Sequence, residues 1–301
     1  MRIIILGPTA SGKTELSIQL AEDLETSIIS ADSRQCFSMM DIGTAKPSKQ
    51  ELTRVRHFNI SNLSLDGDDS AIKFNRRAEV WENEILSNSE HVIYVGGSTL
   101  HLTGLIQPFS DIPDSDPKNI AVLNQRIEDE GIESLFELLK SIDPEYIPKM
   151  DGMNRQRIIR ALDVWMQTGK PFSSFHNNDK LKPDEDSIVF GLQHPREKLY
   201  ARINKRVDLM IQAGLENEVE QILDSGFSPD LQALQTVGYR EVIAHRNGEF
   251  DRKTMIEKIK TNTRRYAKRQ LTWFRRWEFI HWLDADKMTT KELMEKIQST
   301  L

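Results

Sequence analysis

The chain alternates short apolar runs with longer segments in which apolar residues recur every three or four positions. The short runs are rich in Ile, Val and Leu, a composition typical of buried strands. They lie at residues 2–6, 27–30, 91–95 and 188–192, and residues 278–283 could form a last strand. Strands separated by helical segments favour an α/β fold with a parallel sheet, whose ligands bind at the carboxyl ends of the strands.

Helical periodicity follows the first strand, fills the middle of the chain and dominates its last third. The helical ranges are 13–24, 120–129, 132–141, 155–167, most of 196–270, and 290–298. The helix at 155–167 is expected to stop at Gly169, with Pro171 beyond it. We therefore expect a discontinuous α/β core with two helical additions. The expected ranges are 1–112, 150–195 and 263–301 for the core, 113–149 for a small helical insertion and 196–262 for a second helical region.

The apolar runs and the cysteine count indicate where the protein acts. No run is long enough to cross a bilayer, and the N-terminus enters a strand without the pattern of a signal peptide. The single cysteine, Cys36, cannot form an internal disulfide, and the seven His are scattered. We therefore expect a monomeric cytoplasmic protein that makes no contact with a membrane.

The charge is distributed unevenly along the chain. The formal net charge of −6 argues at first against a nucleic-acid partner. Residues 252–276, however, hold ten basic residues and one acidic residue, so this segment carries +9 and the remainder of the chain −15. Such an asymmetry indicates a localised site for a polyanion on an acidic protein.

The segment after the first strand carries a phosphate-binding motif. Residues 7–14 read GPTASGKT, fit G-x-x-x-x-G-K-[ST], and lie between a predicted strand and a predicted helix. The residues expected to bind a diphosphate are Gly7, Pro8, Thr9, Ala10, Ser11, Gly12, Lys13 and Thr14. Backbone amides curl around the phosphates, Lys13 supplies a charge, and the Thr14 hydroxyl can ligate Mg²⁺. A chance match in a glycine loop is the alternative. The motif predicts a P-loop NTPase-like parallel-sheet core with helical insertions, and it does not say which bond is broken.

Further motifs follow in order. They are DSRQ at 32–35, DIGTAKP at 41–47, VGG at 95–97, NRQRIIRALD at 154–163, VGYRE at 237–241 and TRRYAKRQLTWFR at 263–275. Together with the phosphate loop they resemble the bacterial tRNA dimethylallyltransferase (tRNA isopentenyltransferase) family over essentially the whole chain. The resemblance implies transfer of a dimethylallyl group from dimethylallyl diphosphate to the exocyclic amine of the adenosine 3′ of the anticodon in tRNA, with release of diphosphate. It also implies that region 196–262 is a lid that contributes to tRNA binding.

The implied reaction needs a base and donors for the leaving group. The amine must lose a proton, which a carboxylate can accept, and Asp32 follows the second predicted strand where it can face the phosphate loop. Asp32 alone could equally cap a helix or hold Mg²⁺ through water, and the resemblance favours the base. The departing diphosphate gains charge, so donors aimed at it stabilise the transition state. The resemblance assigns this role to Ser98, where the family usually has Thr, and to Arg206; the alternative for Arg206 is a solvated residue on a charged helix.

The resemblance also implies contacts with the tRNA anticodon stem-loop. The implied tRNA-binding residues are Asp32, Ser33, Arg34, Gln35, Gln156, Arg157, Ile158, Ile159, Arg160, Val237, Gly238, Tyr239, Arg240, Arg264, Arg265, Lys268, Arg269, Gln270 and Arg275. Basic residues track phosphates, and aromatic or guanidinium planes stack on unpaired bases. Because the aromatic residues near the C-terminus follow a helical spacing, some of them belong to the core. We expect Trp273 and Phe274 to be at least partly buried, with the arginines and Lys268 facing RNA.

Besides Ser98, five further positions depart from the usual family pattern. They are Cys36, Phe37, Phe58, His101 and Ile120. None is assigned to bond making, but they could alter the shape of the prenyl pocket and the tRNA contacts.

Three other classes of protein share some of these sequence features. A P-loop small-molecule kinase shares the loop, the strand-end acid and an Arg-rich lid, but it leaves the basic segment 252–276 unexplained. An adenylate prenyltransferase acting on free nucleotide would need no tRNA groove. A GTPase or ATPase switch would need an N-K-x-D element. Residues 204–208 read NKRVD, with one residue too many between Lys and Asp, and they lie on a predicted helix, so they do not fit this element.

Overall fold

The computed structural model describes residues 1–109, 112–150, 152–176 and 181–301. These residues form two compact units, one of Met1–Gln107 with Leu181–Leu301 and one of Pro108–Lys180. The second unit is wider than the insertion expected at 113–149, because it also includes the helix Arg155–Thr168 (α7).

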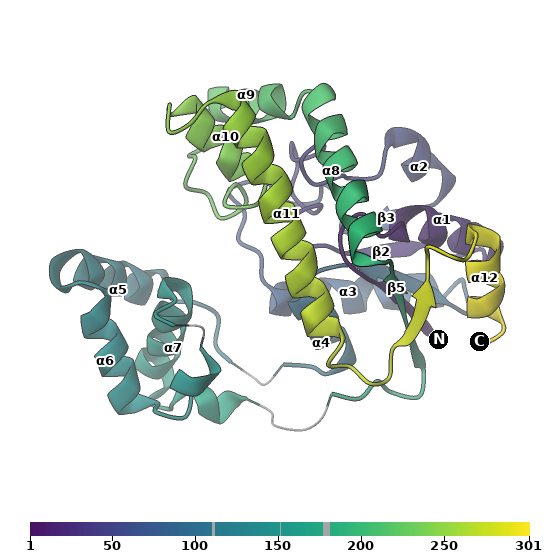
Figure 1. Ribbon diagram of the computed structural model, residues 1–301. Coiled ribbons are helices and arrows are strands. Elements are labelled where there is room, and N and C mark those ends of the chain that lie inside the picture. Colours follow the sequence, from purple (N-terminus) through teal and green to yellow (C-terminus); the bar gives the residue numbers. More distant parts are fainter. Residues whose placement is uncertain (110–111, 151, 177–180) are drawn as a thin grey trace. The chain divides into compact units, whose positions relative to one another are not determined.

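The first unit is built on a six-stranded sheet (Figure 1). Its strands are β1 (Arg2–Leu6), β2 (Ile28–Ala31), β3 (His57–Phe58), β4 (Val92–Gly96), β5 (Ser187–Gln193) and β6 (His281–Asp284). The order is β3-β2-β4-β1-β5-β6, and all neighbouring strands are parallel. The predicted α/β class with a parallel sheet is therefore confirmed. The five predicted strands are present: β1 has the predicted ends and the ends of the others differ by at most three residues, whereas β3, only two residues long, was not predicted.

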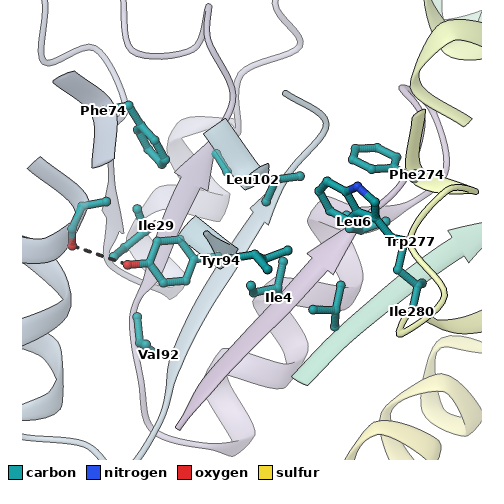
Figure 2. Packing of buried hydrophobic residues seen from close by; sticks show 14 of the residues in the cluster. Ile4, Leu6, Ile29, Phe74, Val92, Tyr94, Leu102, Phe274, Trp277 and Ile280 are labelled. Atoms are coloured by element: carbon teal, nitrogen blue, oxygen red, sulfur yellow. Dashed lines mark hydrogen bonds between the residues drawn. The ribbon is translucent and has the colours of Figure 1, made fainter. Parts of the chain in front are cut away.

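Successive residues of the central strand face opposite sides of the sheet. Ile4 and Leu6 of β1 pack in one core, and Ile3 and Ile5 pack in the other. The helices of this unit are α1 (Lys13–Asp23), α2 (Lys49–Arg54), α3 (Ala71–Leu86), α4 (Thr99–Ile106), α8 (Arg196–Gln212), α9 (Leu215–Asp224), α10 (Tyr239–Arg246), α11 (Arg252–Phe274) and α12 (Thr290–Gln298). Helices α3 and α4 and the end of α11 cover the first core (Figure 2), and α1 and α12 cover the second. Because both faces are covered, the inner strands β1, β2, β4 and β5 are mostly apolar.

The helical region 196–262 has a core of its own. The expected helical pattern is broken at Gly214 and Gly238, whose φ angles of 98° and 100° suit glycine. Val219 of α9, Val242 of α10 and Met255 of α11 are buried together, and the segment after β2 joins them. Helices α8 and α11 pack against each other along their length (Figure 1). The long helix α11 therefore contributes to this core at its start and to the sheet core at its end.

Among the residues that the structure describes, the regular structure of the second unit is entirely helical. It contains α5 (Pro117–Glu130), α6 (Ile132–Ile142), α7, and the 3₁₀ turns η1 (Ile147–Lys149) and η2 (Phe172–Phe175). Leu123, Leu139 and Leu162 meet in its core, so α7 packs on α5 and α6. As predicted, α7 ends at Gly169, which has a left-handed φ of 69°.

None of the helices in the described part of the chain is long and apolar enough to cross a membrane.

A buried hydrogen bond links the central sheet to α3. The Tyr94 hydroxyl donates to Glu82 Oε2 at 2.6 Å, and the Arg2 Nε donates to Glu82 Oε1 at 2.6 Å. We predict that Tyr94→Phe lowers the free energy of unfolding by about 1–3 kcal/mol, because it removes one partner of a buried carboxylate. Chemical denaturation measures the change.

Tyr200→Phe is the matched control. The Tyr200 ring packs on Arg196, and its hydroxyl meets no buried carboxylate within the described ranges. An equal loss of stability in both variants would mean that the bond to Glu82 contributes nothing specific.

Candidate active site

A cavity of about 430 Å³ opens at the carboxyl edge of the sheet. The ends of three strands meet there, since Leu6 of β1 and Ala31 of β2 both pair with Gly96 of β4. The phosphate loop, the segments after β2 and β4, and helices α8 and α11 line the cavity. This is where ligands bind in parallel α/β sheets, as the sequence predicted.

The phosphate loop has the backbone that its motif requires. Gly12 adopts a φ of 98° as it enters α1, and a Cβ on Gly7 would lie 2.9 Å from the carbonyl oxygen of Leu192 on β5. Ala10 holds a positive φ of 64°, rare for a residue with a side chain, while its carbonyl accepts a 2.7 Å hydrogen bond from Arg202 Nε. Thr9, Ala10, Ser11, Gly12, Lys13 and Thr14 line the cavity, whereas Gly7 and Pro8 precede them and bond to Lys13 through their carbonyls.

Two cationic side chains converge on the loop. The Lys13 ammonium donates to the carbonyls of Gly7 and Pro8 at 3.0 and 2.8 Å, and Arg206 Nη1 donates to Thr9 Oγ1 at 3.3 Å. Burial and the nearby Arg206 lower the pKa of Lys13 to about 7, although the charge of Asp32 acts in the opposite direction. Burial, and then the charge of Arg202, likewise lower the pKa of Arg206. The cavity therefore favours an anion, because an anion would stabilise both charged forms.

Asp32 faces the same cavity from the end of β2. Its Oδ1 accepts hydrogen bonds from the backbone amides of Arg34 and Gln35 at 2.8 and 3.3 Å, which fixes the carboxylate at the start of a turn. The structure thus brings together the predicted base, Lys13 and Arg206 around one cavity.

Ser98 is placed beside the cavity. Gly96 and Gly97 line it, and Ser98 begins α4, with its amide donating to the Ala31 carbonyl at 3.2 Å. A Cβ on Gly96 would collide with the backbone of Ala31, so the close approach of β2 and β4 requires this glycine. The Ser98 hydroxyl makes no hydrogen bond that caps α4.

Three residues around the loop were not predicted. Arg202 and His194 bond the carbonyls of Ala10 and Ser11 at 2.7 and 2.9 Å, and Tyr266 lines the cavity. Arg202 precedes Arg206 by four residues on one helix, a spacing that places both on one face and could have identified it.

The predicted tRNA-binding residues of α11 lie mostly at the surface. Arg265, Lys268 and Arg269 on this helix are exposed, as is Arg275 just beyond it, whereas Arg264 is partly buried and donates to Asn204 Oδ1 at 2.6 Å. Phe274 is fully buried and Trp273 partly so, as expected from their spacing.

The segments after β2 and before α10 are held by internal hydrogen bonds. Gln35 donates to the carbonyls of Thr44 and Ala45, and Ser33, Arg34 and Gln35 line the cavity with Asp32. Val237 and Gly238 line it too, while Arg240 is exposed and pairs with Glu241 at 2.8 Å.

Four side chains assigned to tRNA binding are buried, which corrects the expectation that they meet RNA directly. Tyr239 is 0% exposed and donates to Glu218 Oε1 at 2.5 Å, because it closes the core of the helical region. Ile158 and Ile159 face the core of the second unit. Gln270 is 3% exposed; it lines the cavity, and its carboxamide bonds to the backbone of Thr9 and Gly97.

The remaining candidates of the second unit are polar. Gln156 and Arg157 are exposed at the start of α7. Arg160 instead holds its own unit together, donating to the Pro113 carbonyl at 2.5 Å and to the buried Asp163 at 3.0 Å.

The five departures from the family pattern are core residues, and none of them lines the cavity. Cys36 and Phe37 are buried in the helical region, Phe58 in the sheet core and Ile120 is packed in the second unit. His101 stacks on Phe74 with 4.3 Å between ring centres, and burial lowers its pKa to about 3.

Comparison with known proteins agrees with this geometry. The sequence model described as IPP transferase matches residues 35–277. A tRNA dimethylallyltransferase of Christiangramia forsetii is 44% identical over 299 residues, covering 99% of this chain and 98% of the relative, and one of Salinibacter ruber is 43% identical over 300 residues, covering 99% and 92%.

Solved structures give the same result. The tRNA Δ(2)-isopentenylpyrophosphate transferase of Staphylococcus epidermidis matches with a TM-score of 0.72 and 36% identity, covering 99% of this chain and 98% of that one. A eukaryotic dimethylallyltransferase acting on tRNA matches with a TM-score of 0.81 and 25% identity, covering 99% and 77%. The chain therefore belongs to the IPP transferase family, together with the tRNA dimethylallyltransferases.

Proposed function

We propose that this protein transfers a dimethylallyl group from dimethylallyl diphosphate to the exocyclic amine of the adenosine 3′ of the anticodon in tRNA, releasing diphosphate. The observation that carries the proposal is the single cavity in which Asp32 faces Lys13 and Arg206. A cationic phosphate cradle opposite a fixed carboxylate suits a reaction between an anionic leaving group and a nucleophile that loses a proton.

The residues divide the reaction between two sides of the cavity. The bond from the amine nitrogen to the first carbon of the prenyl group forms while the bond from that carbon to the diphosphate oxygen breaks. The amine proton passes to Asp32, and the electron pair of the broken bond leaves with the diphosphate. Lys13, Arg206 and the loop amides stabilise the charge that develops on the leaving group, and Ser98 supplies a hydroxyl beside its bridging oxygen.

The proposed cofactor is Mg²⁺, which Thr14 and the phosphates of the donor would hold. The described residues contain no cluster of three or more His, Cys, Asp or Glu that could hold a metal by itself. A hard cation that binds through one hydroxyl and the substrate phosphates needs no such cluster, and the Thr14 side chain lines the cavity. When bound, the ion would neutralise part of the diphosphate charge.

The basic face of α11 supports tRNA as the acceptor. Arg265, Lys268 and Arg269 are exposed on the same helix whose Tyr266 lines the cavity, so this helix can hold RNA phosphates outside while an unpaired base enters. A small-molecule kinase or a free-nucleotide prenyltransferase has no use for this face.

Asp32→Asn tests the base. Asparagine keeps the oxygen that accepts from the Arg34 and Gln35 amides, so the turn should persist. We expect the single-turnover rate of prenyl transfer to fall by about 10²–10⁴, the usual contribution of a positioned base. Asp66→Asn, at an exposed loop position, is the control. A rate within threefold of the wild type would exclude Asp32 as the base.

The depressed pKa of Lys13 predicts a pH dependence of diphosphate binding. A lysine with a pKa of about 7 is charged below pH 7 and neutral above it, so above pH 7 the anion must recruit a proton when it binds. We expect the advantage of the wild type over Lys13→Met in diphosphate affinity to fall by up to about tenfold per pH unit above 7. Calorimetry in buffers of different ionisation enthalpy measures both affinity and proton uptake. Equal proton uptake in the two proteins would contradict the assignment.

Lys268→Ala tests the RNA surface. Removing one phosphate contact should weaken tRNA binding at all salt concentrations and reduce the slope of log K against log salt by about one. Lys296→Ala on α12, equally exposed, should leave the slope unchanged. If the slope of log K against log salt were the same for the wild type and Lys268→Ala, this lysine would not contact a tRNA phosphate.

A further inference from the structure

Gln270 joins two parts of the active site that follow different strands. Its Oε1 accepts a 3.0 Å hydrogen bond from the backbone amide of Thr9, in the phosphate loop after β1. Its Nε2 donates a 2.8 Å hydrogen bond to the carbonyl of Gly97, in the turn after β4. The side chain is 3% exposed, so neither bond competes with bulk water.

A carboxamide suits the two backbone groups that Gln270 joins. Thr9 offers a donor and Gly97 an acceptor, and the carboxamide carries both complementary groups on one planar unit. Both groups that Gln270 joins are backbone atoms, so the two hydrogen bonds fix the course of the main chain. Gln270 thereby sets the spacing between the loop and the turn.

Gly97, which accepts one of the two hydrogen bonds, lies close to both Gln270 and the phosphate loop. A Cβ on Gly97 would collide with the Gln270 amide nitrogen, and the next nearest atom, the Gly7 carbonyl oxygen, would lie 3.3 Å away. Gly97 therefore leaves room for the carboxamide between two backbone segments. Ser98 follows directly, so the position of the turn decides where its hydroxyl lies.

The helix that carries Gln270 has one face toward the cavity and one toward solvent. Tyr266 and Gln270, one turn apart, both line the cavity. Lys268 and Arg269 between them are exposed. The carboxamide is thus held by a rigid helix that also presents the basic surface.

We propose that Gln270 is a positioning residue for prenyl transfer: it holds the phosphate loop and the turn before Ser98 at the spacing in which both face one leaving group. This role rests on the proposed function and differs from a contact with RNA, because both hydrogen bonds of the carboxamide go to the backbone of the protein itself. Misplacement of reacting groups by about 1 Å can reduce the rate about 10²-fold, so two hydrogen bonds to the backbone suffice to affect catalysis.

The test compares Gln270→Ala and Gln270→Glu with a matched control. Glutamate keeps the size and the acceptor for Thr9 but removes the donor to Gly97, and it serves as the test if the alanine variant does not fold. Gln298→Ala on α12 removes a half-buried glutamine that bonds to Asp23 and does not line the cavity. We expect both Gln270 variants to lose about 10–100-fold in kcat at saturating substrates, with the dissociation constant for tRNA unchanged within about twofold. The control should retain wild-type values.

A double-mutant cycle isolates the bridge. Gly97→Ala should lower kcat in the wild type because its methyl group displaces the carboxamide. In a Gln270→Ala background the displaced group is absent, so Gly97→Ala should have little further effect. Effects on kcat that multiply independently would overturn the proposal, since residues that act through one contact are not additive.

The remaining outcomes are also decisive. A tRNA dissociation constant raised tenfold with kcat unchanged would make Gln270 an RNA contact, and a lower melting temperature with kcat unchanged would make it only structural. Either result overturns the positioning role. Failure of the wild-type protein to transfer the prenyl group would instead contradict the proposed function, and it is measured in the same assay.

Discussion

Two cations held beside one another in a partly buried cavity are the constraint on which the active site depends. Lys13 and Arg206 approach the same loop, and the neighbouring charge of Asp32 does not fully compensate their burial, since the pKa of each is lowered. A diphosphate in the cavity stabilises the charged forms of both residues, because it supplies negative charge beside them. The same two cations therefore serve both binding and catalysis. Burial disfavours their charged forms when no anion is bound, and these charges stabilise the diphosphate as it leaves.

The loop is held in place mainly by segments distant in sequence. Arg202 and His194 bond two of its carbonyls, and Gln270 bonds the amide of Thr9. The positive φ of Ala10 is sustained by such contacts, because an isolated loop would relax toward an ordinary backbone. Helices α8 and α11, which pack against each other, therefore act as a clamp on the phosphate site while the outer face of α11 remains free for RNA.

Local patterns could be predicted from the sequence, and long-range burial could not. The strand, loop and helix around Lys13 are encoded by adjacent residues, and apolar spacing alone predicted that Phe274 is buried. The burial of Tyr239 depends on Glu218, and that of Gln270 on Gly97, partners 21 and 173 residues away. From their motifs alone, Tyr239 and Gln270 were therefore predicted to contact RNA, whereas their side chains make hydrogen bonds inside the fold. The grouping of α7 with α5 and α6 also depends on packing between distant segments.

The arrangement of the strands has a consequence for synthesis on the ribosome. The loop that carries GPTASGKT emerges early, yet its floor at Leu192 belongs to β5, and its bridge at Gln270 comes almost eighty residues later still. A nascent chain that has emerged only through β4 thus displays the whole motif without the strand and helix that shape it. The phosphate site is therefore complete only when translation has passed α11.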